Sequence, residues 1–228
     1  MSANSPVNNM SAELLNHYIK DIDWDLESIN FTLNEATPET IARWALSQKL
    51  PTIVSTSFGE LSAATLHLIS QLDSDIPVVW VDTGFTSLQT QEHAETLTQR
   101  LNLDLKIFRP RLSPIEFLNQ LSTQNPRNLT AEEHSEFTET VKIEPFDRAI
   151  SQFLPKIWIT GIRADETEHR RKQAPASWDR RGILKIAPFF HFTAEDMNAY
   201  LTSYGLPKNL HYDDPTKLDR HLECGLHK

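Results

Sequence analysis

The chain has 228 residues, of which 22 are basic and 31 are acidic, and its formal net charge at pH 7 is −9. A chain this acidic has no general attraction for nucleic acid or for anionic membranes, so we expect neither as a partner. No apolar run approaches the length that spans a bilayer, and residues 1–10 lack a signal-peptide core, so we expect a cytoplasmic protein with one core.

Residues 1–50 predict a polar tail followed by helices that pack on the core. Apolar residues at helical spacing between positions 12 and 35 indicate two amphipathic helices. A third helix is predicted from Pro38, with Thr37 as its N-cap. We expect an α/β nucleotide-binding domain over residues 51–205 and a mobile C-terminal tail over residues 206–228.

Residues 51–72 predict a strand, a hydroxyl-rich loop and a helix. The β-branched run at 52–54 favours the strand, and the apolar spacing after position 61 favours the helix. The N-terminus of a helix has free N–H groups that bind anions, and Ser57 and Ser62 add hydroxyl donors around Gly59. This stretch is therefore a candidate phosphate loop. The alternative is a serine-rich turn that only caps its helix.

Strands alternate with helices through the rest of this domain. Strands are predicted at 78–81, 105–108, 157–159 and 183–187, and helices at 87–101, from the capping box at 113–116, at 147–153 and at 193–204. Residues 124–140 are polar and predict a long loop. The alternation predicts a doubly wound, mostly parallel α/β sheet, with its ligand outside the carboxyl ends of the strands.

Polar residues follow three of these strands directly. Gly59 follows the first, Asp82 and Thr83 follow the second, and Arg163 follows the strand at 157–159. The carboxyl ends of parallel strands meet at one edge of a sheet, so three such loops can line one crevice. Taken singly, Asp82 is equally consistent with a solvated turn residue.

The charge balance reverses between residues 161 and 185. Seven basic against four acidic residues give this window a charge of +3 on an acidic chain. Such a patch predicts a small anionic ligand, and guanidinium groups such as those of Arg163 and Arg170 suit phosphate or sulfate. For Arg171, Lys172 and Arg181 we expect instead a solvated loop in which they pair with neighbouring carboxylates.

Cys224, the single cysteine, lies in a polar tail four residues from the end. One cysteine excludes an intramolecular disulfide and any four-cysteine iron–sulfur or zinc site within this chain. A lone cysteine is commonly a buried small hydrophobe, but this position favours exposure and thiolate chemistry. A third interpretation takes His221, Cys224 and His227 as three metal ligands without a fourth.

Five motifs in this order resemble those of the assimilatory sulfonucleotide reductases. They are Ser-Thr-Ser-Phe-Gly at 55–59, Val-Asp-Thr-Gly at 81–84, Lys-Ile-Glu-Pro at 142–145, Gly-Ile-Arg at 161–163 with Arg170, and Glu-Cys-Gly-Leu-His at 223–227. The resemblance runs from about Thr37 to the end, and it implies an adenine nucleotide alpha hydrolase-like fold. It also implies reduction of 3′-phosphoadenylyl sulfate (PAPS) in sulfate assimilation, with reduced thioredoxin or glutaredoxin as electron donor. The branch that reduces APS has paired cysteines for an iron–sulfur cluster, so for this chain we expect no cluster, no metal and no bound cofactor.

The resemblance further implies a role for each matching residue. The Cys224 thiolate attacks the sulfur of PAPS, which gives a cysteine S-sulfonate and adenosine 3′,5′-bisphosphate, and thioredoxin then frees sulfite. The resemblance implies that the loop cradle is formed by Ser57, Gly59 and Ser62. It places the nucleotide near Asp82 and Thr83, and it implies that the phosphosulfate is held by Lys142, Arg163 and Arg170. Arg220 stands in for basic residues that the family carries before its signature, and His227 matches the signature histidine. A homodimer is compatible with the resemblance, because dimers occur in the family.

Two departures keep other functions open. Glu60 stands where adenylating enzymes with a similar loop carry a lysine, and a carboxylate there repels a triphosphate. The segment before Glu223 is too short for the Gly-Tyr-x-Ser-x-Gly type motif of the family. The alternatives are a sulfonucleotide-binding homologue that acts as a sensor without turnover and an ATP-pyrophosphatase-type enzyme of the same fold.

Overall fold

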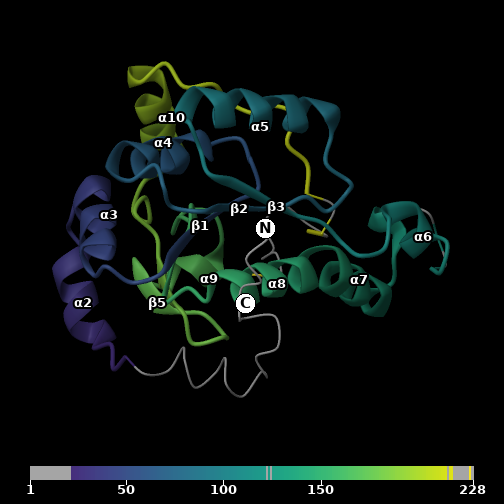
Figure 1. Cartoon of the computed structure of the whole chain (residues 1–228), viewed down its shortest axis with the longest axis horizontal. Helices are drawn as coiled ribbons and strands as arrows, with labels where there is room; N and C mark the ends of the chain where they lie inside the picture. Colours follow the sequence, from purple (N-terminus) through teal and green to yellow (C-terminus); the bar gives the residue numbers. More distant parts are fainter. Residues whose placement is uncertain (1–21, 122, 124, 215, 218–225, 227–228) are drawn as a thin grey trace, which may run out of the picture.

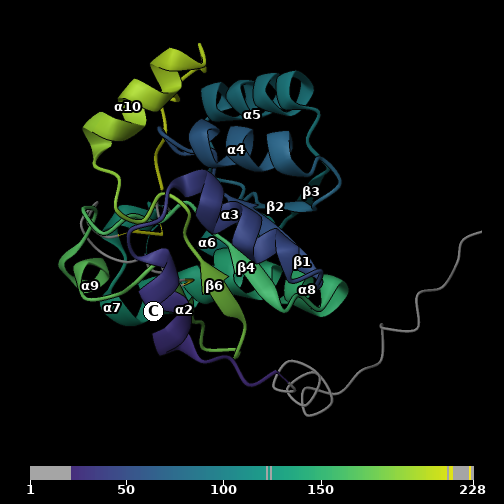
Figure 2. The same ribbon diagram turned by 90° about the vertical axis from the view of Figure 1, so that its left-hand side faces the viewer.

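The computed structural model describes residues 22–121, 123, 125–214, 216–217 and 226 (Figures 1 and 2). Two helices precede the sheet: α2 spans Leu26–Leu33, and α3 spans Pro38–Ser47. Thr37 accepts a hydrogen bond from the Thr40 N–H and Pro38 is in the first turn, as the sequence predicts. Buried residues of both helices belong to the main core cluster. The helix expected within residues 12–21 lies outside the described residues.

Six strands form one sheet in the order β3-β2-β1-β4-β6-β5. Their bounds are Thr52–Thr56 (β1), Val78–Val81 (β2), Leu105–Phe108 (β3), Ile157–Ile159 (β4), Ala176–Trp178 (β5) and Leu184–Ile186 (β6). Every pairing is parallel except β5 with β6. The predicted mostly parallel sheet is confirmed. The sequence analysis missed β5, because its sequence, Ala-Ser-Trp, has no run of β-branched or apolar residues like that of β4.

Helices cover both faces of this sheet (Figures 1 and 2). On one face lie α4 (Ala63–Leu72), α5 (Leu88–Leu101) and α10 (Ala194–Ser203), and on the other lies α8 (Glu144–Phe153). Successive strand residues point to opposite faces, so Val54 packs in the larger core cluster whereas Ile53 packs with Phe146 and Trp158 in the smaller one. No helix in the described part of the chain is long and apolar enough to cross a bilayer.

Residues 124–140 do not form the loop that the sequence predicts. A 3₁₀ turn at Pro126–Asn128 is followed by α7 (Ala131–Thr138) and by a π-helical turn at Glu139–Ile143 that runs into α8. Phe137 and Val141 pack with Phe117 of α6 (Pro114–Leu118) in a cluster of their own. The prediction was wrong because a few apolar side chains at helical spacing suffice when a neighbouring segment buries them.

The chain order reverses beside β1. From β1 the chain proceeds outward to β2 and β3, and then returns to the other side of β1 to form β4. In sheets of this kind a ligand binds where the order reverses, outside the carboxyl ends of the strands. We therefore expect the site at the loops that follow β1 and β4.

Candidate functional site

The loop after β1 contains a residue in a strained backbone conformation. Phe58 has φ of 50°, in the left-handed region that bulky residues rarely adopt. Its side chain is fully buried and meets Trp80 edge to face, with ring centroids 5.0 Å apart. Its backbone N–H donates to Thr56 Oγ1 at 2.9 Å. These contacts offset the strain, so the loop is shaped independently of any ligand.

The helix after this loop begins without a side-chain cap. Ser62 is the N-cap of α4, but its hydroxyl donates to the Gly59 carbonyl at 2.8 Å and caps no helix N–H. The interpretation that the serines only cap the helix therefore does not hold for Ser62. Ser57 is exposed and Gly59 is half-buried. The absence of a side-chain cap is compatible with the predicted anion site at this helix N-terminus.

The turn after β4 packs directly on α4. A Cβ at Gly161 would lie 3.1 Å from Thr65 Oγ1, which is closer than ordinary contact. Thr65 is 3% exposed, and its Oγ1 has no hydrogen-bond partner in the described part of the chain. The turn after β4 thus packs on the first turn of α4 where the strand order reverses, and the absence of a side chain at Gly161 favours this close approach.

Asp82 and Thr83 are buried in the turn after β2. Asp82 Oδ1 accepts hydrogen bonds from the Gly84 N–H at 3.1 Å and from Thr86 Oγ1 at 3.2 Å. Its Oδ2 accepts from Arg109 Nε at 2.9 Å. At 5% exposure Asp82 is not the solvated turn residue that was the alternative prediction. Oδ1 therefore stabilises the turn after β2, and Oδ2 connects this turn to Arg109 directly after β3.

Arg163 and Arg170 are buried and paired with carboxylates from their own segment. Arg163 Nε donates to Asp165 Oδ1 at 3.0 Å, and Arg170, in α9 (Glu168–Arg171), pairs with Glu166. The arginines are 7% and 4% exposed. A buried guanidinium requires such pairing, so both arginines already have acidic partners within the predicted cationic window. Sequence reasoning assigned them to an anionic ligand because residue order alone does not show which charges are buried.

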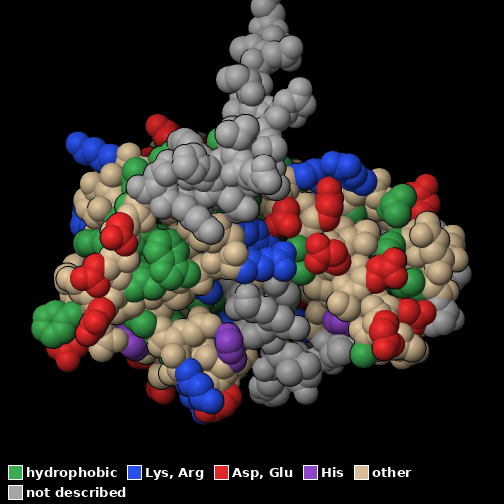
Figure 3. All heavy atoms as spheres, turned by 90° about the horizontal axis from the view of Figure 1, so that it is seen from below, with side chains coloured by type: hydrophobic (Ala, Val, Ile, Leu, Met, Phe, Trp, Pro, Cys, Tyr) green, Lys and Arg blue, Asp and Glu red, His purple; other side chains and the backbone are tan. Residues whose placement is uncertain are grey.

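Pairing was predicted for Arg171, Lys172 and Arg181; Arg171 and Arg181 are paired, and Lys172 is exposed. Arg171 is exposed and lies 3.1 Å from Glu168. Arg181 pairs with Asp147 and, at 2.6 Å, with Asp179, but its side chain is only 12% exposed and is therefore not solvated as expected. Figure 3 shows the molecule from below, where Lys and Arg side chains gather near the centre and acidic side chains lie on both sides.

Lys142 lies in the π-helical turn before α8 and contacts the C-terminal segment. Its Nζ donates to Asp214 Oδ2 at 2.6 Å and to Thr216 Oγ1 at 3.0 Å. Burial raises the pKa of Asp214, but the charge of Lys142 and the hydrogen bonds from Lys142 and Thr216 outweigh it and lower that pKa to about 2. Asp214 was not predicted, because no spacing relates it to a lysine 72 positions earlier.

Residues 209–214, which we call the strap, cross the phosphate loop. Asn209 is 3% exposed, and its side-chain nitrogen donates to the Phe58 carbonyl and to Thr90 Oγ1, both at 2.8 Å. Its backbone N–H donates to the Glu60 carbonyl at 3.4 Å. This end of the strap is therefore anchored on the loop after β1.

Tyr212 connects the loop to the lysine. Its ring would lie 3.6 Å from a Cβ at Gly59, and its hydroxyl donates to Asp214 Oδ2 at 3.3 Å. Since the same Asp214 oxygen accepts from Lys142, one short path joins Gly59, Tyr212, Asp214 and Lys142. The predicted residues Lys142 and Gly59 therefore belong to one site.

Three predicted site residues lie outside the described residues: Arg220, Cys224 and His227. The metal interpretation of His221, Cys224 and His227 lies outside them as well. Within the described residues no group of three or more His, Cys, Asp or Glu could hold a metal ion. Leu226 is described: it is 9% exposed and belongs to the smaller core cluster with Phe146 and Trp158. Leu226 therefore contacts the core on the α8 face.

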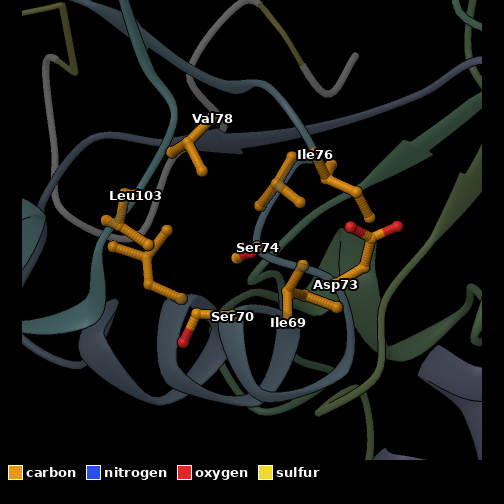
Figure 4. A pocket seen from close by; sticks show the side chains of 9 residues that line it. Ile69, Ser70, Asp73, Ser74, Ile76, Val78 and Leu103 are labelled. Atoms are coloured by element: carbon orange, nitrogen blue, oxygen red, sulfur yellow. The ribbon is translucent and has the colours of Figure 1, made fainter.

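Two cavities lie away from the strap. One of about 10 Å³ lies between α4 and the beginning of β2, lined by Ile69, Asp73 and Val78 (Figure 4), and it is too small for a nucleotide. One of about 220 Å³ lies between α5 and the strands β2 and β3, lined by Trp80, Asp82 and other residues. It adjoins the turn that Asp82 organises.

Comparison with known proteins identifies the family. A family model described as "Phosphoadenosine phosphosulfate reductase domain" matches residues 51–215. The chain belongs to this reductase family. A "Phosphoadenosine 5′-phosphosulfate reductase" of a Synechocystis species is 34% identical over 191 residues, which cover 83% of this chain and 76% of the relative. The protein of that name from a Synechococcus species is 32% identical over 189 residues, which cover 82% and 81%.

Solved structures agree with the reductase family in fold. The phosphoadenylyl-sulfate reductase of Candida auris, in a phosphate complex, has a TM-score of 0.68 at 23% identity and covers 88% of this chain and 90% of its own. The FMN adenylyltransferase of Candida glabrata has a TM-score of 0.54 at 14% identity and covers 87% and 65%. The adenine nucleotide alpha hydrolase-like fold is therefore confirmed.

Proposed function

We propose that this protein reduces PAPS to sulfite and adenosine 3′,5′-bisphosphate through a cysteine S-sulfonate on Cys224. The observation that supports it most is the convergence of Lys142, the loop of Gly59 and the turn of Gly161 where the strand order reverses, in a chain of the reductase family. A phosphate-binding loop beside a buried lysine suits a ligand with both phosphate and sulfate groups.

In the proposed first step, the Cys224 thiolate attacks the sulfur of the sulfate group. A bond forms between the two sulfur atoms, the bond from sulfur to the bridging phosphate oxygen breaks, and the electron pair leaves with the nucleotide. Negative charge develops on the leaving phosphate, where Lys142, Arg163 and Arg170 stabilise it. Ser57, Gly59 and Ser62 cradle the nucleotide phosphate.

In the second step, a thiolate of reduced thioredoxin or glutaredoxin attacks Cys224 Sγ and releases sulfite. The second thiol of the donor then attacks the mixed disulfide and regenerates Cys224. The donor dithiol supplies the two electrons that convert sulfate sulfur to sulfite. Leu226, buried two residues after Cys224, supports a tail that docks on the core. A homodimer stays a prediction, and Phe31 of α2, which is 90% exposed, offers an apolar contact for it.

The alternative is a homologue that binds sulfonucleotides without turnover. It is favoured by the short tail and by the carboxylate that already holds Lys142. An ATP-pyrophosphatase-type enzyme is disfavoured, because Glu60 is exposed on the phosphate loop and repels a triphosphate.

Incubation with PAPS in the absence of thioredoxin tests the proposal. We expect intact mass to show one added SO₃ group on Cys224 and reduced thioredoxin to release sulfite from that adduct. Cys224→Ser should form no adduct and release no sulfite, while it binds adenosine 3′,5′-bisphosphate like the wild type. A protein that binds this nucleotide but forms no adduct is the sensor. Unchanged turnover in Cys224→Ser contradicts the mechanism. Sulfite release measured in parallel with APS reports the selectivity between the two substrates.

A further inference from the structure

Asp214 lies where the proposed function requires an anion. Its Oδ2 is 2.6 Å from Lys142 Nζ, and both side chains are 8% exposed. A carboxylate oxygen and a sulfate oxygen are equivalent partners for an ammonium group, since both are charged acceptors. Because the Lys142 side chain is enclosed to this extent, little room is left for a sulfate or phosphate group beside the Asp214 carboxylate.

The same strap covers the phosphate loop. The Tyr212 ring occupies the space above Gly59, at 3.6 Å from a Cβ built there, and its hydroxyl donates to Asp214. Thr216 donates its hydroxyl to Asp214 Oδ1 at 2.6 Å and its N–H at 3.0 Å, which holds the carboxylate in place. The strap therefore covers both the candidate phosphate loop and Lys142.

Apart from the Asp214 contacts, the strap is attached at two places that differ in strength. Asn209 is buried and makes two side-chain hydrogen bonds of 2.8 Å. Asp213 pairs with Arg127 at the surface, where the two side chains are 53% and 52% exposed, and such pairs add little. The strap can therefore leave the site by pivoting about Asn209 once the Asp214 contact is replaced.

We propose that the strap is an autoinhibitory closure in which Asp214 competes with the sulfonucleotide for Lys142 and Tyr212 covers the phosphate loop. The inference rests on the proposed function and adds regulation of the same site. A closed form lowers the apparent affinity by the fraction of molecules that are open, so removal of the competing charge raises affinity. The substrate, which carries several negative charges, displaces a single carboxylate because its phosphate groups also bind the loop after β1 that Tyr212 covers.

The test compares Asp214→Asn with Asp213→Asn in the full chain. Each variant loses one negative charge from adjacent positions, and asparagine at 214 retains an oxygen that accepts from Thr216. Calorimetry measures PAPS binding, and hydrogen–deuterium exchange follows the peptide that contains the strap. We expect Asp214→Asn to bind PAPS about tenfold more tightly than the wild type and Asp213→Asn to stay within about twofold. PAPS should accelerate exchange in the wild-type strap, and Asp214→Asn should show fast exchange without ligand.

The outcomes separate this inference from the proposed function. If the wild type binds PAPS and Asp214→Asn binds it no more tightly than Asp213→Asn, the closure is overturned while the proposed function stands. Unchanged exchange in the wild-type strap upon PAPS binding overturns the closure as well. If no form binds PAPS, the proposed function fails, and inorganic sulfate decides the closure: tighter sulfate binding by Asp214→Asn supports it, and equal binding overturns it.

Discussion

Asn209 and Phe58, which are 151 positions apart, are joined by a 2.8 Å hydrogen bond from the Asn209 side-chain nitrogen to the Phe58 carbonyl. The bond holds the strap on a residue whose backbone is in the left-handed region, with φ of 50°. The residues around Asn209 and Phe58 do not predict this contact. The contact nevertheless determines how the strap lies over the candidate phosphate loop.

Asn209→Ala tests this anchor. The substitution removes three side-chain hydrogen bonds, one of them accepted from the His211 N–H, and leaves the Phe58 carbonyl and Thr90 Oγ1 buried, so we expect the free energy of unfolding to fall by about 2 kcal/mol. Urea denaturation measures the change. Leu210→Ala is the control, because Leu210 is 74% exposed on the same segment and its loss should stay within about 0.5 kcal/mol. Equal effects of the two variants contradict the anchor.

Arg170→Gln and Arg171→Gln separate a buried cation from an exposed one. Arg170 is 4% exposed and pairs with Glu166, whereas Arg171 is largely exposed and pairs with Glu168. We expect Arg170→Gln to lower kcat/KM for PAPS by about 100-fold or more, because a transition-state charge contact is lost. Arg171→Gln should change it less than about twofold.

If Arg170 has only a structural role, Arg170→Gln should be less stable than the wild type but should keep its kcat/KM when it is folded. Melting curves for both arginine variants provide this control. If folded Arg170→Gln protein retains wild-type kcat/KM, Arg170 does not serve the reaction.

Gly161→Ala tests the contact between the loop after β4 and α4. The added Cβ would lie 3.1 Å from Thr65 Oγ1, and the β-branched Thr65 has little rotamer freedom in a helix. We expect Gly161→Ala to lower the free energy of unfolding by about 1 to 2 kcal/mol. Thr65→Ala, which removes a buried hydroxyl without a partner in the described residues, should relieve most of this loss in the double variant. If the changes in the free energy of unfolding of the two single variants simply add up in the double variant, the clash is absent.

The Lys142–Asp214 pair predicts a pH dependence of stability. The pKa of Asp214 is about 2 in the folded chain and has an ordinary value of 3.8. The unfolded chain therefore takes up the proton first as pH falls, so the contribution is complete above about pH 4 and declines as pH falls toward 2. Between pH 5 and pH 3 we expect the wild type to lose of order 1 kcal/mol relative to Asp214→Asn, measured by urea denaturation at each pH. A constant difference between the two proteins over this range contradicts the ionised pair.

Local patterns accounted for most of the sheet and its helices. The strands β2 and β3 have the predicted bounds, and the capping pattern at Ser113 to Glu116 is present as two reciprocal hydrogen bonds. The failures were the helical stretch at Ala131–Thr138 and the edge strand β5. In both, a neighbouring segment supplies the burial or pairing that the short local pattern does not contain.

The sequence by itself determined the alternation of strands and helices, the polar loops that follow the strands and the cysteine signature of the tail, because these depend on residue order over a few positions. Only the tertiary structure decided which charges are buried, such as that of Arg163 beside Asp165, and that Lys142 pairs with Asp214 across 72 positions. Burial makes an unpaired charge costly, and a distant partner such as Asp214 reaches its lysine through the path of the folded backbone, which local spacing does not record.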